Sequence, residues 1–267
     1  MCSAFLRVVV RGLPLVCTLA ASLCAQPATL RVCADPNNLP FSNQQGEGFE
    51  NKLAELIASG MNAKLEYTWW SERKSFAKKA LEGGACDVVM GVPTSMGDVS
   101  TTSPYYRSTY VFVSRRDRRL QISSLTDPRL ADLKIGMHVV GDDFAPPSIL
   151  LAREGIAKNI VGYSLFGSYG EPNPASKLVR AVETGEVDVA IMWGPFAGYF
   201  AETSPTRLEI TPVKPAAFLG VPFSYDISAA VRQGNESLLS QLDAVLKSQM
   251  PAISKILASY GVPRSSN

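Results

Sequence analysis

The regular alternation of strand-like and helix-like segments constrains the fold of this chain more than any other feature. Short apolar runs at 30–34, 65–70 and 86–92 are typical of strands buried in a sheet. Between them, residues 49–60 and 71–83 carry apolar side chains at helical spacing and end at glycines, which terminate helices. Because a β-α-β-α-β order places its strands in one sheet with right-handed crossovers, we predict an α/β fold with a mostly parallel sheet.

A second cycle of the same pattern follows and divides the chain. It contains strand-like runs at 110–114, 134–140 and 187–192 and helix-like segments at 147–154 and 177–184. A closing strand at 225–231 and two terminal helices then return to the first cycle. Since single cores stop growing near roughly 250 residues, we predict two lobes, each a mostly parallel sheet flanked by helices. Lobe 1 comprises residues 26–109 plus 226–267 and is discontinuous, and lobe 2 comprises residues 110–225.

The composition excludes several classes of function. The chain has one histidine, His138, so a metal site with two or three imidazoles cannot be built, and a catalytic triad would have to use this residue. The 26 basic side chains are balanced by 24 acidic ones, which is not typical of nucleic-acid binding. The short basic run at 115–119 contains an acid and is interpreted as a solvated linker between the lobes. We therefore predict no cofactor, no metal site and no nucleic-acid partner.

The first 34 residues contain no acidic side chain and are organised like an export signal. Arg7 and Arg11 precede a short apolar run that ends at the small residue Ala25, which predicts a cleavable signal peptide at 1–25 and a periplasmic mature protein. A membrane anchor is the alternative, but the run is about half the ~20 residues that a span needs, so we expect no span in the mature protein. The two arginines account for the formal charge of +2, so the mature chain is neutral.

Loss of the signal peptide would leave two cysteines, Cys33 and Cys86. Two cysteines in an oxidising compartment most simply form one disulfide. Both lie at the ends of strand-like runs, and neighbouring parallel strands are close enough for such a bond. The alternative is a pair of buried free thiols.

Polar and aromatic side chains follow several predicted strands at their carboxyl ends, where open α/β sheets bind their ligands. The candidates are Asp35, Asn38, Phe41, Trp69, Trp70, Thr94, Asp142 and Trp193. Each residue alone is also explained by capping, turn formation or core packing. Together they predict a shared cleft suited to a small solute.

Several motifs resemble those of the family 3 periplasmic solute-binding proteins of ABC importers. They are LRVCADPNNLPF at 30–41, SPYY at 103–106 and GEVDVA at 185–190. The resemblance covers nearly all of the mature chain. It implies a two-lobed periplasmic binding protein fold of type II, with two hinge strands that include Tyr106, Arg107 and Tyr225 and close the lobes around a ligand.

The chain departs from the amino-acid binders of that family at both ionic anchors. Those proteins hold the ligand carboxylate with an arginine and the ligand ammonium with an aspartate. Counting from the matching motifs places Met96 and Trp193 at these positions. Because an amino acid in a closed cleft would leave its charges poorly compensated, we do not expect amino-acid capture.

A narrower resemblance accounts for these departures. The segments at 32–43, 48–51, 67–70, 86–93 and 104–112 are similar to the J-type accessory proteins encoded beside PQQ-dependent methanol dehydrogenases. This resemblance implies a periplasmic partner of a quinoprotein alcohol dehydrogenase, with a role in its assembly or activation. It does not imply that the chain itself binds PQQ, calcium or a lanthanide.

Three functional hypotheses follow. The first is a non-enzymatic accessory protein that associates with a quinoprotein alcohol dehydrogenase. The second is an importer receptor for a small polar solute other than a standard amino acid, working with an ABC permease. The third is an enzyme with this fold, such as a dehydratase, for which no acid–base pair can be placed from the sequence.

Overall fold

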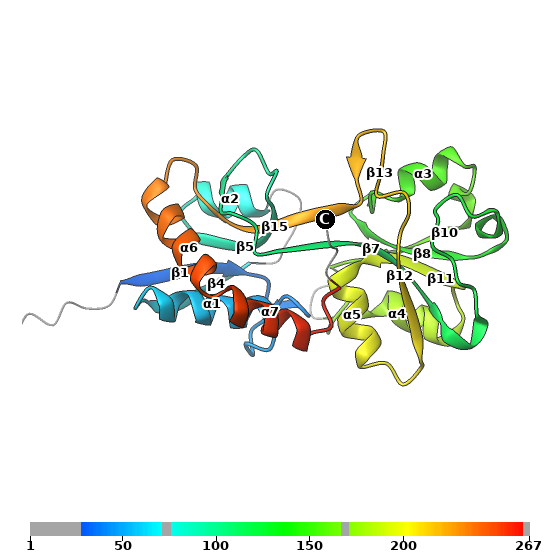
Figure 1. Ribbon diagram of the computed structural model, residues 1–267, viewed down its shortest axis with the longest axis horizontal. Helices are drawn as coiled ribbons and strands as arrows, with labels where there is room; N and C mark the ends of the chain where they lie inside the picture. Colours follow the sequence, from blue (N-terminus) through cyan, green and yellow to red (C-terminus); the bar gives the residue numbers. More distant parts are fainter. Residues whose placement is uncertain (1–27, 71–75, 167–170, 264–267) are drawn as a thin grey trace, which may run out of the picture.

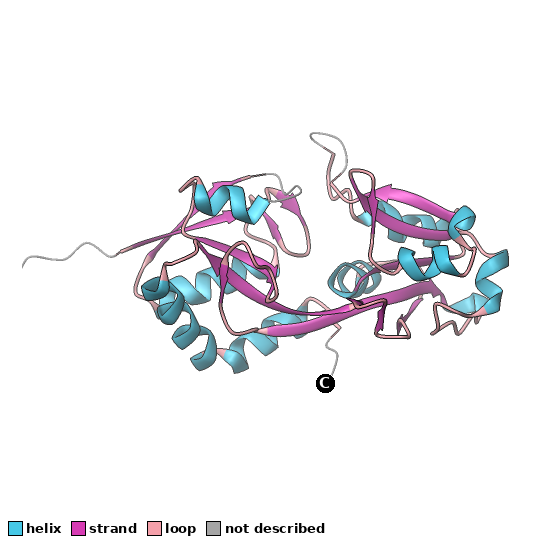
Figure 2. Cartoon of the chain, turned by 90° about the horizontal axis from the view of Figure 1, so that it is seen from above, coloured by secondary structure: helices cyan, strands magenta, loops and turns pink. Residues whose placement is uncertain are grey.

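The computed structural model describes residues 28–70, 76–166 and 171–263. The predicted signal peptide, residues 1–25, and the start of the helix predicted at 71–83 lie outside the described residues. Two α/β lobes lie end to end along the long axis and are joined by long crossing strands (Figure 1). Seen from above, the lobes lie at opposite ends of these strands, which run from one lobe into the other (Figure 2).

Lobe 1 contains a parallel sheet whose inner strands are largely buried, whereas its edge strand is partly exposed. Its elements are β1 (Thr29–Ala34), β4 (Lys64–Trp69), β5 (Val88–Pro93), α1 (Phe49–Gly60), α2 (Phe76–Glu82), α6 (Glu236–Ser248) and α7 (Met250–Ser259). β1 lies between β4 and β5 and pairs in parallel with both. Alternate residues of β5 point to opposite faces: Val88 packs in the cluster that includes α1, α6 and α7, and Val89 packs toward α2. This two-sided burial explains the continuous apolar runs of the sequence.

Lobe 2 repeats this arrangement. Its elements are β8 (Ile135–Val140), β10 (Ile160–Ser164), β11 (Val189–Trp193), β12 (Leu208–Pro212), α3 (Ser148–Arg153), α4 (Ser176–Thr184) and α5 (Gly194–Glu202). β8 pairs in parallel with β10 on one side and with β11 on the other. Along β11, Ala190 and Met192 face the cluster that includes α4 and α5, whereas Val189 and Ile191 face the cluster that includes α3.

The structure also contains shorter strands and 3-10 helices. They are β2 (Asn37–Asn38), β3 (Ser42–Asn43), β6 (Ser100–Thr101), β9 (Asp143–Phe144), β13 (Ala217–Phe218), β14 (Val221–Pro222) and the 3-10 helices η1 (Arg116–Arg118), η2 (Pro128–Asp132) and η3 (Ala157–Asn159). In the part of the chain that is described, no helix combines the length and the apolar composition needed to cross a membrane.

Two antiparallel strands connect the lobes, as the predicted type II fold requires. They are β7 (Tyr106–Arg115) and β15 (Ser224–Val231), and they pair between Tyr106 and Thr109 on one strand and Ser224 and Ile227 on the other. Across this pair, the Arg107 guanidinium lies 2.7 Å from the carboxylate of Asp226. The predicted lobe boundaries at 109/110 and 225/226 fall inside these two strands and remain a prediction, as does the hinge role of Tyr106, Arg107 and Tyr225.

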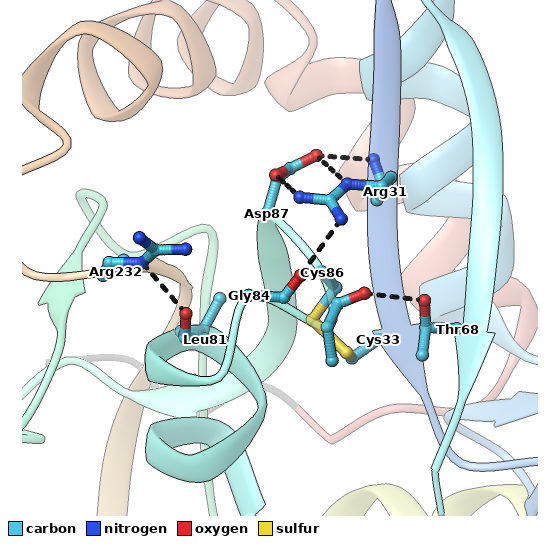
Figure 3. Close-up of polar contacts among 9 residues, drawn as sticks. Arg31, Cys33, Thr68, Leu81, Gly84, Cys86, Asp87 and Arg232 are labelled. Atoms are coloured by element: carbon cyan, nitrogen blue, oxygen red, sulfur yellow. Dashed lines mark hydrogen bonds and ion pairs between the residues drawn. A yellow bond between two sulfur atoms is a disulfide. The ribbon is translucent and has the colours of Figure 1, made fainter.

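The predicted disulfide between Cys33 and Cys86 is confirmed, with Cα atoms 5.5 Å apart. It joins β1 to the turn that precedes β5, and both cysteines are buried. Figure 3 shows a polar network beside it: the Arg31 guanidinium donates to both carboxylate oxygens of Asp87 and to the carbonyl of Gly84. The bond and the network therefore fix the same two neighbouring strands.

The helix α5 stands where the sequence pattern predicted only a loop. Gly194 and Gly198 are poor helix formers, which hid the helix, although Pro195 suits its first turn. Packing explains the second glycine: a Cβ atom at Gly198 would lie 1.8 Å from the carbonyl oxygen of Gly261. The chain after α7 therefore crosses directly over the backbone of α5 and ties lobe 2 to the carboxyl-terminal segment.

Candidate functional site

A pocket of about 180 Å³ opens in lobe 2 where β8 and β11 end at their carboxyl edge. The described residues that line it are Tyr110, His138, Val140, Asp143, Phe144, Ala145, Pro146, Leu165, Trp193 and Phe196. Four of these side chains are aromatic besides the imidazole, and Asp143 is the one acidic side chain in this set. The position agrees with the rule that open α/β sheets bind ligands at the carboxyl ends of their strands.

The aromatic wall of the pocket continues into the crossing strands. The Tyr110 and Trp193 rings lie 5.3 Å apart, and Trp193 in turn meets Tyr225 of β15 at 5.9 Å. Burial raises the pKa of the Tyr110 hydroxyl, so this group stays protonated at any physiological pH. The aromatic part of the wall therefore offers apolar ring surface and neutral hydroxyls, and Asp143 is the one acidic side chain beside it.

His138 supplies the principal polar atom of the wall. Its side chain is 5% exposed, its ring packs edge-on against Phe196, and its Nε2 atom lies 3.1 Å from the carbonyl oxygen of Ala175. Burial lowers the pKa of this imidazole from 6.5 to about 4, so the ring is neutral near pH 7. Because the Ala175 carbonyl can only accept, Nε2 carries the proton and Nδ1 is left as a hydrogen-bond acceptor.

Aromatic side chains also fill the space between the lobes behind this pocket. Phe41 of lobe 1 contacts Phe49 and Phe196, with ring centroids 5.0 Å away in both cases. Phe49 also meets Tyr106 of β7 at 6.0 Å. These residues belong to a single buried cluster that contains side chains of both lobes, including Leu178 from α4. The lobes therefore share a hydrophobic core at this point.

A polar contact also joins the lobes beside this cluster. The Asn37 side-chain amide of lobe 1 donates to the carbonyl of Glu171 and accepts from the backbone N–H of Asn173 in lobe 2. In addition, the Ser108 hydroxyl of β7 donates to the carbonyl of Pro263 over 2.7 Å and fixes the carboxyl-terminal segment against this strand.

Only some of the residues that were predicted to form a ligand-binding cleft lie at this pocket. Trp193 lines the pocket, and Phe41 lies behind it. Asp35 is 5% exposed and its carboxylate accepts from the backbone N–H of Asn37, and Asn38 is buried in the short strand β2. The Thr94 hydroxyl donates to the carbonyl of Asp226.

The remaining candidates lie elsewhere on the surface. Trp69 stacks on Tyr67 at 4.7 Å, on the outer strand of lobe 1. Trp70 is 39% exposed and its ring meets Phe76 at 6.2 Å. Asp142 is exposed in the turn between β8 and β9. A ligand-binding role for these residues stays a prediction.

Several pocket residues were not selected from the sequence. Tyr110 and Phe144 lie on strands, and Phe196 lies on the helix α5, which the pattern concealed. His138 was not selected, because a lone histidine is more often a structural or surface residue than a functional one. The signal that could have found it is its place next to the carboxyl end of β8. Among the described residues, no group of three or more His, Cys, Asp and Glu side chains is placed to hold a metal ion.

Comparison with known proteins gives matches over most of the chain. The model of the bacterial extracellular solute-binding proteins, family 3, matches residues 30–262. Protein MoxJ of Methylorubrum extorquens is 33% identical, with 92% of this chain and 85% of MoxJ covered. Protein MoxJ of Paracoccus denitrificans is 28% identical, with 92% of each chain covered.

Solved structures give the same result. MxaJ from Methlophaga aminisulfidivorans superimposes with a TM-score of 0.79 at 29% identity, covering 89% of this chain and 100% of that one. The periplasmic binding protein XoxJ from Methylobacterium extorquens gives a TM-score of 0.73 at 31% identity, covering 90% and 100%. The two-lobed α/β fold predicted from the sequence, with two strands connecting the lobes, is thus confirmed. The chain belongs to the family 3 bacterial extracellular solute-binding proteins, within the group that includes the MoxJ proteins.

Proposed function

We propose that this chain is a non-enzymatic periplasmic accessory protein that associates with a quinoprotein alcohol dehydrogenase and assists its assembly or activation. The similarity to MoxJ, MxaJ and XoxJ supports this proposal. It agrees with the resemblance to the J-type accessory proteins described above, which implies a quinoprotein dehydrogenase as the partner. The periplasmic location is supported by the family, whose members are extracellular solute-binding proteins.

The observation that carries the proposal is the shared aromatic core between the lobes. A receptor that captures solutes must separate its lobes, and that motion would part and expose the rings of Phe41 and Phe196, which meet across the lobes. Exposing one fully buried side chain of this size costs about 1.5–3 kcal/mol. The packing therefore favours a protein whose lobes keep a fixed relation, which suits recognition by a folded partner.

Exposed apolar side chains offer surface for such a partner. The β13–β14 hairpin projects from the body of the protein (Figure 1), and Leu219 at its tip is 75% exposed. Leu219 also has a positive φ of 49°, a backbone conformation that disfavours a leucine and favours asparagine or aspartate. Residues 215–222 contain no charged side chain. A leucine held at this tip is poorly explained by folding alone and well explained by contact with another protein.

Leu219→Asp is expected to weaken association with the dehydrogenase at least tenfold, because it places a negative charge in the proposed contact. The substitution should not strain the fold, because aspartate tolerates the positive φ at this position better than leucine does. Ile149→Asp is the matched control, since Ile149 is also exposed, at 41%, but lies on α3. The measurement is the dissociation constant of each variant for dehydrogenase purified from the same organism, together with dehydrogenase activity after deletion of the chain. Absence of association and unchanged activity after deletion would contradict the proposed function.

The pocket itself supports a second candidate, a receptor for a small solute that works with an ABC permease. Its volume of about 180 Å³ and its neutral aromatic wall suit a small uncharged molecule that donates a hydrogen bond to His138. A solute of this class at 100 times its dissociation constant should raise the free energy of unfolding by about 2.7 kcal/mol, and Trp193→Ala should abolish the effect. A thermal-shift screen of small alcohols and amides in which no compound stabilises the wild-type protein would remove this candidate.

A further inference from the structure

A cluster of arginines surrounds a hollow of about 380 Å³ in lobe 2, outside the aromatic pocket. The hollow is lined by Arg116, Asp117, Arg119, Thr206 and Arg207. It lies where β7 ends and η1 begins, next to the segment that leads into β12. The sequence pattern suggested that this run was a solvated linker between the lobes, but the structure places it at the end of a strand, with a defined surface.

The arginines of this region fall into two groups. Arg115 forms a two-point ion pair with Asp117, with contacts of 3.1 and 2.6 Å, and Arg118 lies 3.0 Å from Asp188. Arg116, Arg119 and Arg207, by contrast, have no carboxylate within 4.0 Å among the described residues. The one acid in the hollow, Asp117, is already neutralised by Arg115.

The backbone fixes the positions from which these three side chains project. β7 and β12 are antiparallel, with Arg115 opposite Leu208, so the two arginine-bearing segments are neighbours. The Arg116 N–H donates to the carbonyl of Arg207 over 2.9 Å, and the Arg119 N–H donates back to Arg116 over 3.2 Å. A local charge of about +3 therefore stands at a defined place on a chain whose predicted mature form has no net charge.

Guanidinium groups of this kind recognise carboxylates by paired, parallel hydrogen bonds. Three charges around one hollow are too few and too localised for the extended phosphate track of a nucleic acid. All three residues are exposed, which suits a protein surface better than a small anion, because a small anion needs a more enclosed site.

We propose that Arg116, Arg119 and Arg207 form a docking site for an acidic segment on the surface of the dehydrogenase. This inference rests on the proposed function and names the surface used. Charge pairs at the rim of an interface mainly raise the association rate and fix how the two proteins are positioned against each other. Their effect becomes weaker as the salt concentration rises.

The test is the triple variant Arg116→Glu/Arg119→Glu/Arg207→Glu. It should bind the dehydrogenase roughly 100-fold more weakly than wild type at low salt, since each exposed pair contributes a factor of up to about five. The matched control is Arg153→Glu/Lys158→Glu/Lys255→Glu, which changes the net charge equally at exposed positions on other elements. The control variant should lose less than threefold in its affinity for the dehydrogenase. Thermal unfolding of both variants should remain within a few degrees of wild type, because all six side chains are exposed.

A second measurement does not depend on the dehydrogenase. A fluorescein-labelled peptide of eight glutamates should bind the wild type and the control variant at low salt, as followed by fluorescence anisotropy, and should lose at least tenfold in affinity for the arginine variant. An equal loss of affinity in the arginine variant and the control variant, in either assay, would show an effect of net charge alone. That result would contradict the proposed docking site. Undiminished dehydrogenase binding by the arginine variant would overturn it while leaving the proposed function intact. A third result is that the wild type binds the peptide through these arginines but does not bind the dehydrogenase. In that case the proposed function fails and docking to the dehydrogenase fails with it, although the arginines still bind an acidic peptide.

Discussion

Replacing Cys33 and Cys86 together with alanine is expected to lower the free energy of unfolding by about 4 kcal/mol. The two residues are 53 positions apart, and in the chain-entropy model a closed loop of this length restricts the unfolded chain by about that amount. The side chains are only 2% and 1% exposed, so the smaller alanines add a further loss of packing. For a domain whose total stability is 5–15 kcal/mol, this is a large fraction.

Urea denaturation of the double variant and of the wild type measures this effect directly. Wild-type protein unfolded in the presence of a reducing agent is the control, because it loses the bond without losing the sulfur atoms. The polar network of Arg31 with Asp87 and Gly84 remains in both cases and should keep the native strands paired (Figure 3). Equal midpoints for the oxidised wild type and the double variant would contradict the assigned role of the disulfide.

The architecture was predictable because its signals are local. Continuous apolar runs marked β1, β5, β8 and β11, and glycines marked the ends of α1 and α2. The disulfide followed from compartment and strand neighbourhood together. For the strands, the residue pattern and the fold follow the same constraint, because a strand covered on both faces must be largely apolar.

The site was less predictable because its residues are selected by contacts between distant segments. Phe41 meets Phe196 across 155 positions of the chain, and the packing of Gly198 against Gly261 cannot be read from either glycine alone. The arginine run at 115–119 was interpreted from composition as solvated, but its pairing pattern depends on Asp188, which lies far along the sequence. Tertiary contact, which single-sequence patterns do not carry, decides these roles.

The titration of His138 is expected to cause a large pH dependence of the free energy of unfolding. The folded-state pKa of this imidazole, about 4, lies below the value of 6.5 for an unfolded chain. Between these two values the unfolded chain binds a proton that the folded chain does not, so stability is greatest above pH 6.5 and falls as the pH falls toward 4. A shift of this size corresponds to a loss of about 3 kcal/mol across the window.

His138→Gln isolates this contribution, because glutamine keeps an N–H donor for the Ala175 carbonyl but does not titrate. Carboxylates that pair with arginine, such as Asp117 and Asp127, also lose stabilisation in acid, and they do so equally in both proteins. The difference in unfolding free energy between pH 7 and pH 4 should therefore be about 3 kcal/mol smaller in the variant. Because the chain has one histidine, the imidazole signals in a proton NMR titration report this group alone, and a midpoint near 6.5 would contradict its burial in the wall of the pocket.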